Sequence, residues 1–188
     1  MSVASIAARQ LRRLTGGEVG SAERKVGREL FTKGGNEAEA LLGVDIGGAK
    51  AALPRKRGKG HTMPTDQLML ANKARGYRRE GIIEKLLKAL FPKEENFRVY
   101  GEQYLRDRFG NIAIHDATHE SRRIDFLVLK GKEIVQSVEV TGEEVSKAAQ
   151  LQKEMDIRKH GGRYVLDPES GELLRWPAGL KTRVVRLK

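Results

Sequence analysis

The chain of 188 residues is long enough for one domain with an extension, and its 36 lysines and arginines against 25 acidic residues give a net charge of +11. This balance favours a polyanionic partner, with nucleic acid ahead of an anionic membrane surface. The absence of cysteine excludes a disulfide framework, a thiolate zinc site and a cysteine nucleophile. No stretch approaches the roughly 18 apolar residues of a membrane span, and no secretory signal is recognisable, so we expect a soluble domain without stable membrane insertion.

The first part of the chain differs from the remainder in its pattern. Short helices are predicted over about 3–14 and 21–32, and glycine pairs and the basic run RKRGKG (55–60) follow without sustained periodicity. We therefore predict a helical and flexible basic extension or linker over 1–70 and one folded domain over 71–188.

The chain from residue 71 onward shows helical and alternating patterns in turn. A helix is predicted over 72–90, where apolar residues recur at helical spacing before Pro92 ends the pattern. A second helix is predicted over 142–160, since Thr141-x-x-Glu144 has capping-box spacing and a glycine pair follows. Strands are predicted over 97–105, 122–129, 134–141, 163–166 and 182–187. The order of helix, three strands, helix and strand indicates a layered, mixed α/β fold.

Two acidic residues lie in the hairpin of the second and third predicted strands. If its loop comprises residues 131–133, Asp125 lies directly opposite Glu139, with the two Cβ atoms about 5 Å apart. Two carboxylates so close repel each other unless a cation compensates them. Mg²⁺ prefers oxygen ligands and keeps positions for water and phosphate. The pair, next to a basic surface, therefore suggests metal-assisted phosphodiester hydrolysis; the alternative is that both acids lie on a solvated face of the hairpin.

Residues 122–168, RRIDFLVLKGKEIVQSVEVTGEEVSKAAQLQKEMDIRKHGGRYVLDP, resemble the restriction-endonuclease-like nucleases of the PD-(D/E)xK superfamily. The narrower resemblance is to toxin domains of that fold in bacterial polymorphic toxins, including contact-dependent growth inhibition and secretion-system effectors. It covers residues 71–175 and rests on an Arg-x-Asp strand, a Glu-Val-Thr strand end and the pattern Lys-x-x-Gln-x-x-Lys-Glu in the following helix. It implies an αβββαβ core with a mixed central sheet flanked by helices.

The resemblance also implies roles for acidic residues. Asp125 is similar to the motif aspartate and Glu139 to the second acid, and both would be ligands of Mg²⁺ or Mn²⁺. Glu80, on the first helix, resembles the helix-borne acid and would be the third metal ligand. Glu102, on the first strand, is a rival for that role.

Thr141 stands where the superfamily pattern has a lysine, which stabilises the charge that develops on the phosphoryl group. Lys147 or Gln150 from the following helix would replace that lysine. Lys147, Gln150 and Glu154 share one helical stripe, so Lys147 and Gln150 can both point at the strand end. The local alternatives are that Lys147 pairs with a neighbouring glutamate and that Thr141 is only a helix cap.

Several basic residues are predicted to contact the phosphate backbone of a nucleic acid. They are Arg78, Arg79, Arg122, Arg123 and Lys153. Together with the resemblance, they predict a Mg²⁺-dependent endonuclease toxin that is delivered from the producing bacterium into the cytoplasm of a competing cell. Its substrate would be DNA or RNA, and tRNA is one RNA substrate considered. A cognate immunity protein is then expected, and an acidic one would complement the charge of +11. The alternative is a non-catalytic nucleic-acid-binding module on the same fold, which the threonine at position 141 keeps open.

Overall fold

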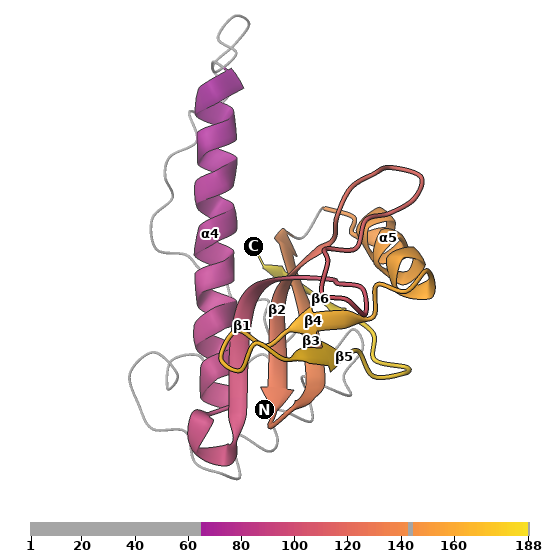
Figure 1. The fold of residues 1–188 in the computed structure, drawn as a ribbon. Helices are drawn as coiled ribbons and strands as arrows, with labels where there is room; N and C mark the ends of the chain where they lie inside the picture. The colour runs from indigo at the N-terminus through magenta and orange to yellow at the C-terminus, as the bar shows by residue number, and fades with distance from the viewer. Residues whose placement is uncertain (1–64, 143–144, 188) are drawn as a thin grey trace, which may run out of the picture.

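The computed structural model describes residues 65–142 and 145–187, apart from the side chains of 65–68. These residues form a mixed α/β fold in which α4, η1, β1, β2, β3, α5, β4, β5 and β6 follow one another (Figure 1). The mixed α/β class predicted from the sequence is confirmed. The predicted helices over 3–14 and 21–32 and the basic run at 55–60 lie outside the described residues. None of the described helices is long and apolar enough to span a membrane.

Helix α4, Thr65–Leu90, is longer than the predicted helix over 72–90. Its C-terminal half buries the side chains predicted from the helical spacing, among them Ile83 and Leu87. The helix ends before Pro92, as predicted, and the short 3-10 helix η1, Lys93–Glu95, leads into the sheet. In Figure 1 the N-terminal half of α4 extends beyond the edge of the sheet.

The central sheet has four strands in the order β1-β2-β3-β6. The first three strands pair antiparallel, whereas β6 runs parallel to β3. The bounds of these strands are Phe97–Tyr104 for β1, Arg123–Lys130 for β2, Glu133–Gly142 for β3 and Arg183–Leu187 for β6. A parallel pair needs a long crossover, and residues 145–182 supply it. The five predicted strands are all present, and each end is displaced by at most one residue.

The crossover contains helix α5, Ala148–Lys159, and a second sheet of β4, Tyr164–Leu166, and β5, Leu173–Arg175. Strand β5 was not predicted, because it contains no β-branched or aromatic residue, whereas β4 contains Tyr164 and Val165. Helix α5 begins six residues later than predicted, and its N-terminal boundary residue is Lys147. The prediction that Thr141 caps this helix is therefore wrong, since Thr141 lies within β3.

The turn between β2 and β3 is tighter than predicted. Lys130 pairs with Glu133, so the loop consists of Gly131 and Lys132 only. Gly131 has a φ of 58°, a left-handed conformation that glycine adopts at no steric cost. The three-residue loop predicted from the sequence is wrong.

An irregularity in the ladder corrects the register after this turn. The pairing shifts by one residue between Val128 and Leu129, so that Phe126 faces Val138. The next positions along the two strands are Asp125 and Glu139. The bulge thus restores the register that a three-residue loop would have given, and the two acids occupy facing positions on neighbouring strands.

The sheet packs on both faces. The α4 cluster lies between α4 and the sheet; its buried members are Ile83, Leu86, Leu87, Leu90, Phe91, Phe97, Phe126, Val128, Val138, Val140, Val185 and Leu187. The α5 cluster lies on the opposite face; its buried members are Leu105, Ile124, Leu127, Leu129, Ile134, Ile157, Val165, Leu174 and Trp176. Val135 was predicted to share the face of Glu139, but the bulge turns it towards the α4 cluster.

Candidate functional site

Asp125 and Glu139 lie on the face of the sheet that packs towards α5. Val138 and Val140, the strand neighbours of Glu139, belong to the α4 cluster, so alternation directs Glu139 to the other side, and Asp125 faces it from β2. Asp125 is half-buried, and its Oδ2 accepts a hydrogen bond from the backbone N–H of Val140 at 2.8 Å. Glu139 is only 1% exposed. The sequence alternative of a solvated hairpin face therefore does not describe these residues.

Glu139 is held by two cations, one on each carboxylate oxygen. Lys147, just before α5, donates from Nζ to Oε1 at 2.8 Å. Arg122, just before β2, donates from Nη2 to Oε2. Lys147 thus reaches back to the strand end, and its side chain is only 15% exposed. The alternative partners of Lys147 considered from the sequence, residues 143 and 144, lie outside the described part of the chain.

Arg122 does not occupy the surface position that the sequence prediction gave it. Its side chain is buried, with the residue only 6% exposed, so its guanidinium compensates Glu139 instead of facing a phosphate backbone. Arg122 also lies near a second acid, because its Nε is 3.7 Å from Oε2 of the buried Glu154 on α5. On α5, Arg158 Nη2 lies 3.4 Å from Oε1 of the same glutamate. We call Arg122, Glu139, Lys147, Glu154 and Arg158 the buried charge network.

The pKa of Asp125 is raised from 3.8 to about 6. Burial is the largest cause and the negative charge of Glu139 is the second, while the hydrogen bond from Val140 and the charge of Lys147 act in the opposite direction. Within the described residues Asp125 has no ion-pair partner, unlike Glu139. Asp125 is therefore the acid of this pair whose charge is not compensated.

Glu80 and Glu102 lie near this pair. Burial raises the pKa of Glu80, and the charges of Glu102 and Glu139 add to that effect against the opposing charge of Arg123. The pairing of β1 with β2 places Glu102 across from Asp125, but Glu102 has a φ of 54° and its carboxylate pairs with Arg123 Nη1 at 3.0 Å. In residues 65–142 and 145–187, no group of three or more metal-binding side chains is assembled. Glu80 is thus close enough to influence the pair electrostatically but does not join it in a preformed three-acid site.

The two residues predicted to compensate for the missing lysine differ in position. Lys147 contacts Glu139, whereas Gln150 is exposed on the first turn of α5. Thr141 is buried in β3 and pairs with Arg186 of β6 in the parallel ladder. The geometry therefore brings Lys147 to the acids and leaves Gln150 outside them.

The other predicted phosphate contacts surround the same end of the sheet or lie on its flank. Arg79 places its guanidinium over the strand end, where a Cβ added to Gly142 would lie 3.6 Å from Arg79 Nη1. Arg78 and Arg123 are exposed. Lys153 on α5 pairs with Glu120 of the long loop before β2.

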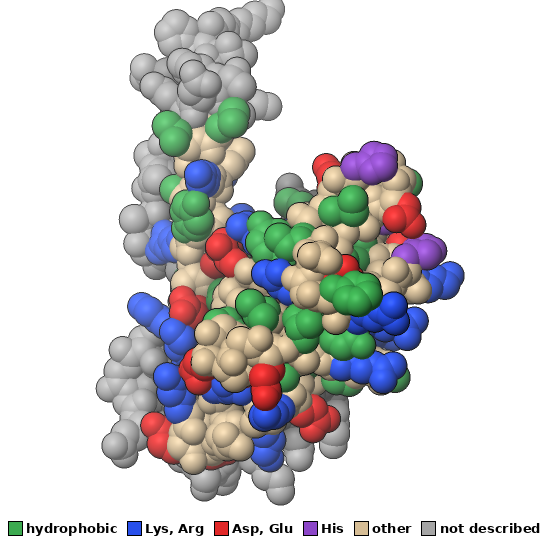
Figure 2. Space-filling model, viewed as in Figure 1, with side chains coloured by type: hydrophobic (Ala, Val, Ile, Leu, Met, Phe, Trp, Pro, Cys, Tyr) green, Lys and Arg blue, Asp and Glu red, His purple; other side chains and the backbone are tan. Residues whose placement is uncertain are grey.

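The molecular surface is hollowed between the N-terminal half of α4 and the part of the molecule that carries α5 (Figure 2). The hollow is bordered by the end of the sheet at which strands β3 and β6 end and β2 begins (Figure 1). The acids and their cations lie near these strand ends. The candidate site therefore belongs to the end of the sheet that borders this hollow.

Sequence reasoning missed the buried roles of Arg122 and Glu154. A signal was present in each case: Arg122 stands two residues before Ile124, a core residue of the α5 cluster, and Glu154 lies on the stripe of Lys147. Comparison with known proteins finds no matching family model, and no curated protein or solved structure matches the chain. Inference about function therefore starts from the geometry of this site.

Proposed function

We propose that this protein is a metal-dependent nuclease of the PD-(D/E)xK type that hydrolyses phosphodiester bonds in DNA or RNA. The observation that carries the proposal is the pair Asp125 and Glu139, side by side on adjacent strands with Lys147 at the second acid. The net charge of +11 supports a polyanionic substrate.

The order of elements supports a restriction-endonuclease-like core. One helix, three antiparallel strands, a second helix and a strand parallel to the third follow one another, with the β4–β5 hairpin as an addition before the last strand. The two acids lie on the second and third strands, as the resemblance of residues 122–168 implies. Fold alone does not define function, so the proposal depends on the site.

Two carboxylates, those of Asp125 and Glu139, are suitable ligands for a divalent cation. Asp125 has an uncompensated carboxyl with a pKa raised to about 6, and Glu139 is its neighbour, so a cation bound by both would offset their repulsion. When bound there, Mg²⁺ or Mn²⁺ would polarise the phosphoryl group and lower the pKa of an attacking water. Water and phosphate oxygens would complete the coordination, since Glu80 is not assembled with the pair.

The residues of the chain have separate roles in this proposal. Lys147 supplies the positive charge that stabilises the transition state, in place of the lysine that the superfamily has at position 141. Arg78, Arg79, Arg123 and Lys153 bind and orient the phosphate backbone. Glu80 supplies a further negative charge near the cation.

We further propose that the domain acts as a toxin in bacterial competition, delivered into the cytoplasm of a target cell. A cognate immunity protein would protect the producer. An acidic immunity protein fits the charge of +11, because complementary charge accelerates association and favours the correct partner.

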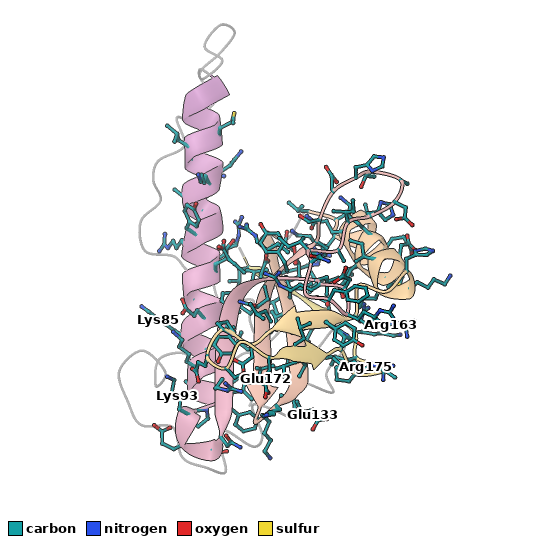
Figure 3. The ribbon with its side chains drawn as sticks, in the orientation of Figure 1. Lys85, Lys93, Glu133, Arg163, Glu172 and Arg175 are labelled. Atoms are coloured by element: carbon teal, nitrogen blue, oxygen red, sulfur yellow. The ribbon has the colours of Figure 1, made fainter. Side chains whose placement is uncertain are left out.

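Cleavage assays on plasmid DNA and on total RNA, with Mg²⁺, with Mn²⁺ or with EDTA, test the nuclease proposal. Glu139→Gln and Asp125→Asn should each lower the cleavage rate by about 100-fold or more, the size expected when a charge-stabilising group is removed. The matched control is Glu133→Gln, which changes an exposed glutamate at the other end of the same strand (Figure 3). Cleavage that persists in EDTA, or that is equal in Glu139→Gln and the control, would sink the proposal.

A second candidate is a nucleic-acid-binding module without catalysis. The specific observation in its favour is that both carboxylate oxygens of Glu139 already have cationic partners, Arg122 and Lys147. In that case metal-independent binding to DNA or RNA should occur without cleavage, and Glu139→Gln should leave the affinity for nucleic acid unchanged.

A further inference from the structure

Glu154 is a buried acid to which the proposed chemistry gives no role. It is 1% exposed, and burial raises its pKa against the lowering effects of Thr182, Arg158 and Arg122. A buried carboxylate is costly unless it is compensated. The contacts that compensate it show what it does.

Glu154 is fixed from one side by β6 and its own helix. Thr182, just before β6, donates a hydrogen bond from Oγ1 to Glu154 Oε1 at 2.5 Å, and Arg158 Nη2 lies 3.4 Å from the same oxygen. Arg158 is itself anchored, because it donates to the backbone carbonyl of Leu180 at 2.8 Å and stacks over Trp176. Glu154 Oε1 is thus occupied, and Oε2 is the oxygen directed to Arg122.

Arg122 lies between two buried carboxylates. Its Nη2 donates to Glu139, while its Nε lies 3.7 Å from Glu154 Oε2, which is too long for a hydrogen bond. In the described structure, Arg122 Nε and Glu154 Oε2 are both buried without a hydrogen-bond partner. Glu154 therefore acts on Arg122 through charge, and one guanidinium serves two acids.

This sharing determines how negative the end of β3 remains. Arg122 and Lys147 together carry enough charge to cancel Glu139 completely, and the negative charge of Glu154 offsets part of it. Without that charge, Arg122 would neutralise Glu139 more fully, and a divalent cation would be attracted less strongly to Glu139 and Asp125.

We propose that Glu154 is a positioning residue which, through Arg122, keeps the charge of Glu139 available to a divalent cation. The inference rests on the proposed metal site at Asp125 and Glu139. It gives α5 a second function besides packing, since one turn of its helix sets the electrostatics of a neighbouring strand.

Binding of Mn²⁺ to the full chain, measured by calorimetry in the absence of nucleic acid, tests this role without reference to activity. Glu154→Gln preserves the size of the side chain and an acceptor for Thr182 but removes the charge, and it should weaken Mn²⁺ binding about tenfold. Glu154→Asp retains the charge and should lose much less affinity. Glu133→Gln is the matched control, because it removes one negative charge at an exposed position at the other end of β3.

The same measurement in an Arg122→Met background shows whether Glu154 acts through the guanidinium. Methionine removes the positive charge on which Glu154 acts, so Glu154→Gln should then have little further effect. An unchanged affinity in Glu154→Gln, or an equal loss in both backgrounds, overturns the positioning role alone. If the wild-type chain does not bind Mn²⁺, the proposed metal site fails and this inference fails with it.

Discussion

The two faces of the central sheet are built on different physical principles. On one face α4 packs an apolar helix stripe against apolar strand residues. On the other face the α5 cluster covers the middle of the sheet, but Arg122 and Glu139 near the strand ends and Glu154 on α5 are at most 6% exposed. The α4 face derives its stability from removing apolar surface from water, whereas this part of the α5 face depends on the mutual compensation of buried charges.

The contrast indicates where function is located. Replacing a buried ion network with apolar residues is often neutral or stabilising, so such a network is not needed for the fold. Charged groups with perturbed pKa values that gather at one edge of a sheet are the features expected of a functional site. Asp125 is coupled to this network by the charges of Glu139 and Lys147, which act on its pKa in opposite directions.

The largest effect is expected from removing the shared cation. Arg122→Met would leave Glu139 and Glu154 buried without it, and should lower the free energy of unfolding by about 3–5 kcal/mol in urea denaturation. The matched control is Arg123→Met, the exposed neighbour that pairs with the exposed Glu102, for which a change within about 0.5 kcal/mol is expected. Equal effects of the two substitutions would show that the network does not stabilise the fold.

The α4 face should respond to the loss of volume instead of charge. Leu87 is completely buried, so Leu87→Ala should cost about 2–5 kcal/mol by removing apolar contacts and leaving a cavity. Its neighbour Lys88 is exposed and pairs with Glu84 along the helix, and Lys88→Ala should cost only about 0.3–0.5 kcal/mol. Because the loss is hydrophobic, the effect of Leu87→Ala should be nearly independent of salt, whereas screening weakens the exposed pair of Lys88. A strong dependence on salt for Leu87→Ala would contradict this account.

The charged face should also differ from the apolar face in its dependence on pH. The pKa of Asp125 is raised to about 6 in the folded protein, against 3.8 for the ordinary side chain. The folded state therefore holds this proton more tightly than the unfolded state, and the resulting stabilisation is fully present below pH 3.8 and is lost as the pH rises to about 6. Asp125→Asn cannot ionise and should be about 2 kcal/mol more stable than the wild type near pH 7, with allowance for solvent screening.

Urea denaturation of both proteins across this pH range, in buffers without divalent cations, checks the expectation. The difference between wild type and Asp125→Asn should shrink towards zero as the pH falls below the ordinary pKa. Added Mg²⁺ should stabilise the wild type near neutral pH and leave the variant unchanged, because ligand binding stabilises only the state that binds. A difference that is constant with pH would contradict the raised pKa of Asp125.

The apolar parts of the fold were predicted from the sequence more completely than the charged residues on the α5 face. The helix over α4 and the central strands were predicted because their apolar residues follow a regular period, and Leu87 or Val138 signals burial by its type alone. The facing positions of Asp125 and Glu139 were also predicted, although the predicted loop was wrong. The loop is one residue shorter than expected, and the bulge beside Val128 shifts the pairing by one residue and so restores the predicted register. A bulge leaves no mark in the alternation that could reveal it in advance.

The buried charge network could not be predicted in the same way. Arginine and glutamate are mostly exposed in proteins, so Arg122 was predicted to lie on the surface. Glu154 was placed on the helical stripe of Lys147, but no function was predicted for it. The two meet only because the crossover brings α5 onto the face of β3, a contact between residues far apart in the chain. Lys147 was singled out because the resemblance of residues 122–168 implies a lysine at position 141, where this chain has a threonine, and not because of any periodicity.

The smallest effect, and one of opposite sign, is expected from a glycine in α4. A Cβ added to Gly81 meets nothing within 4 Å, so Gly81→Ala should stabilise the protein by about 0.5–1 kcal/mol through the higher helix propensity of alanine. Gly162, which follows α5, provides the contrast, because a Cβ there would lie 2.5 Å from Ile157 Cγ2 and 2.7 Å from Ala113 Cβ. Gly162→Ala should therefore destabilise by about 1–3 kcal/mol. Thermal unfolding of the two variants gives the comparison directly, and a loss of stability in Gly81→Ala would show that α4 is packed more closely at this position than its open surroundings indicate.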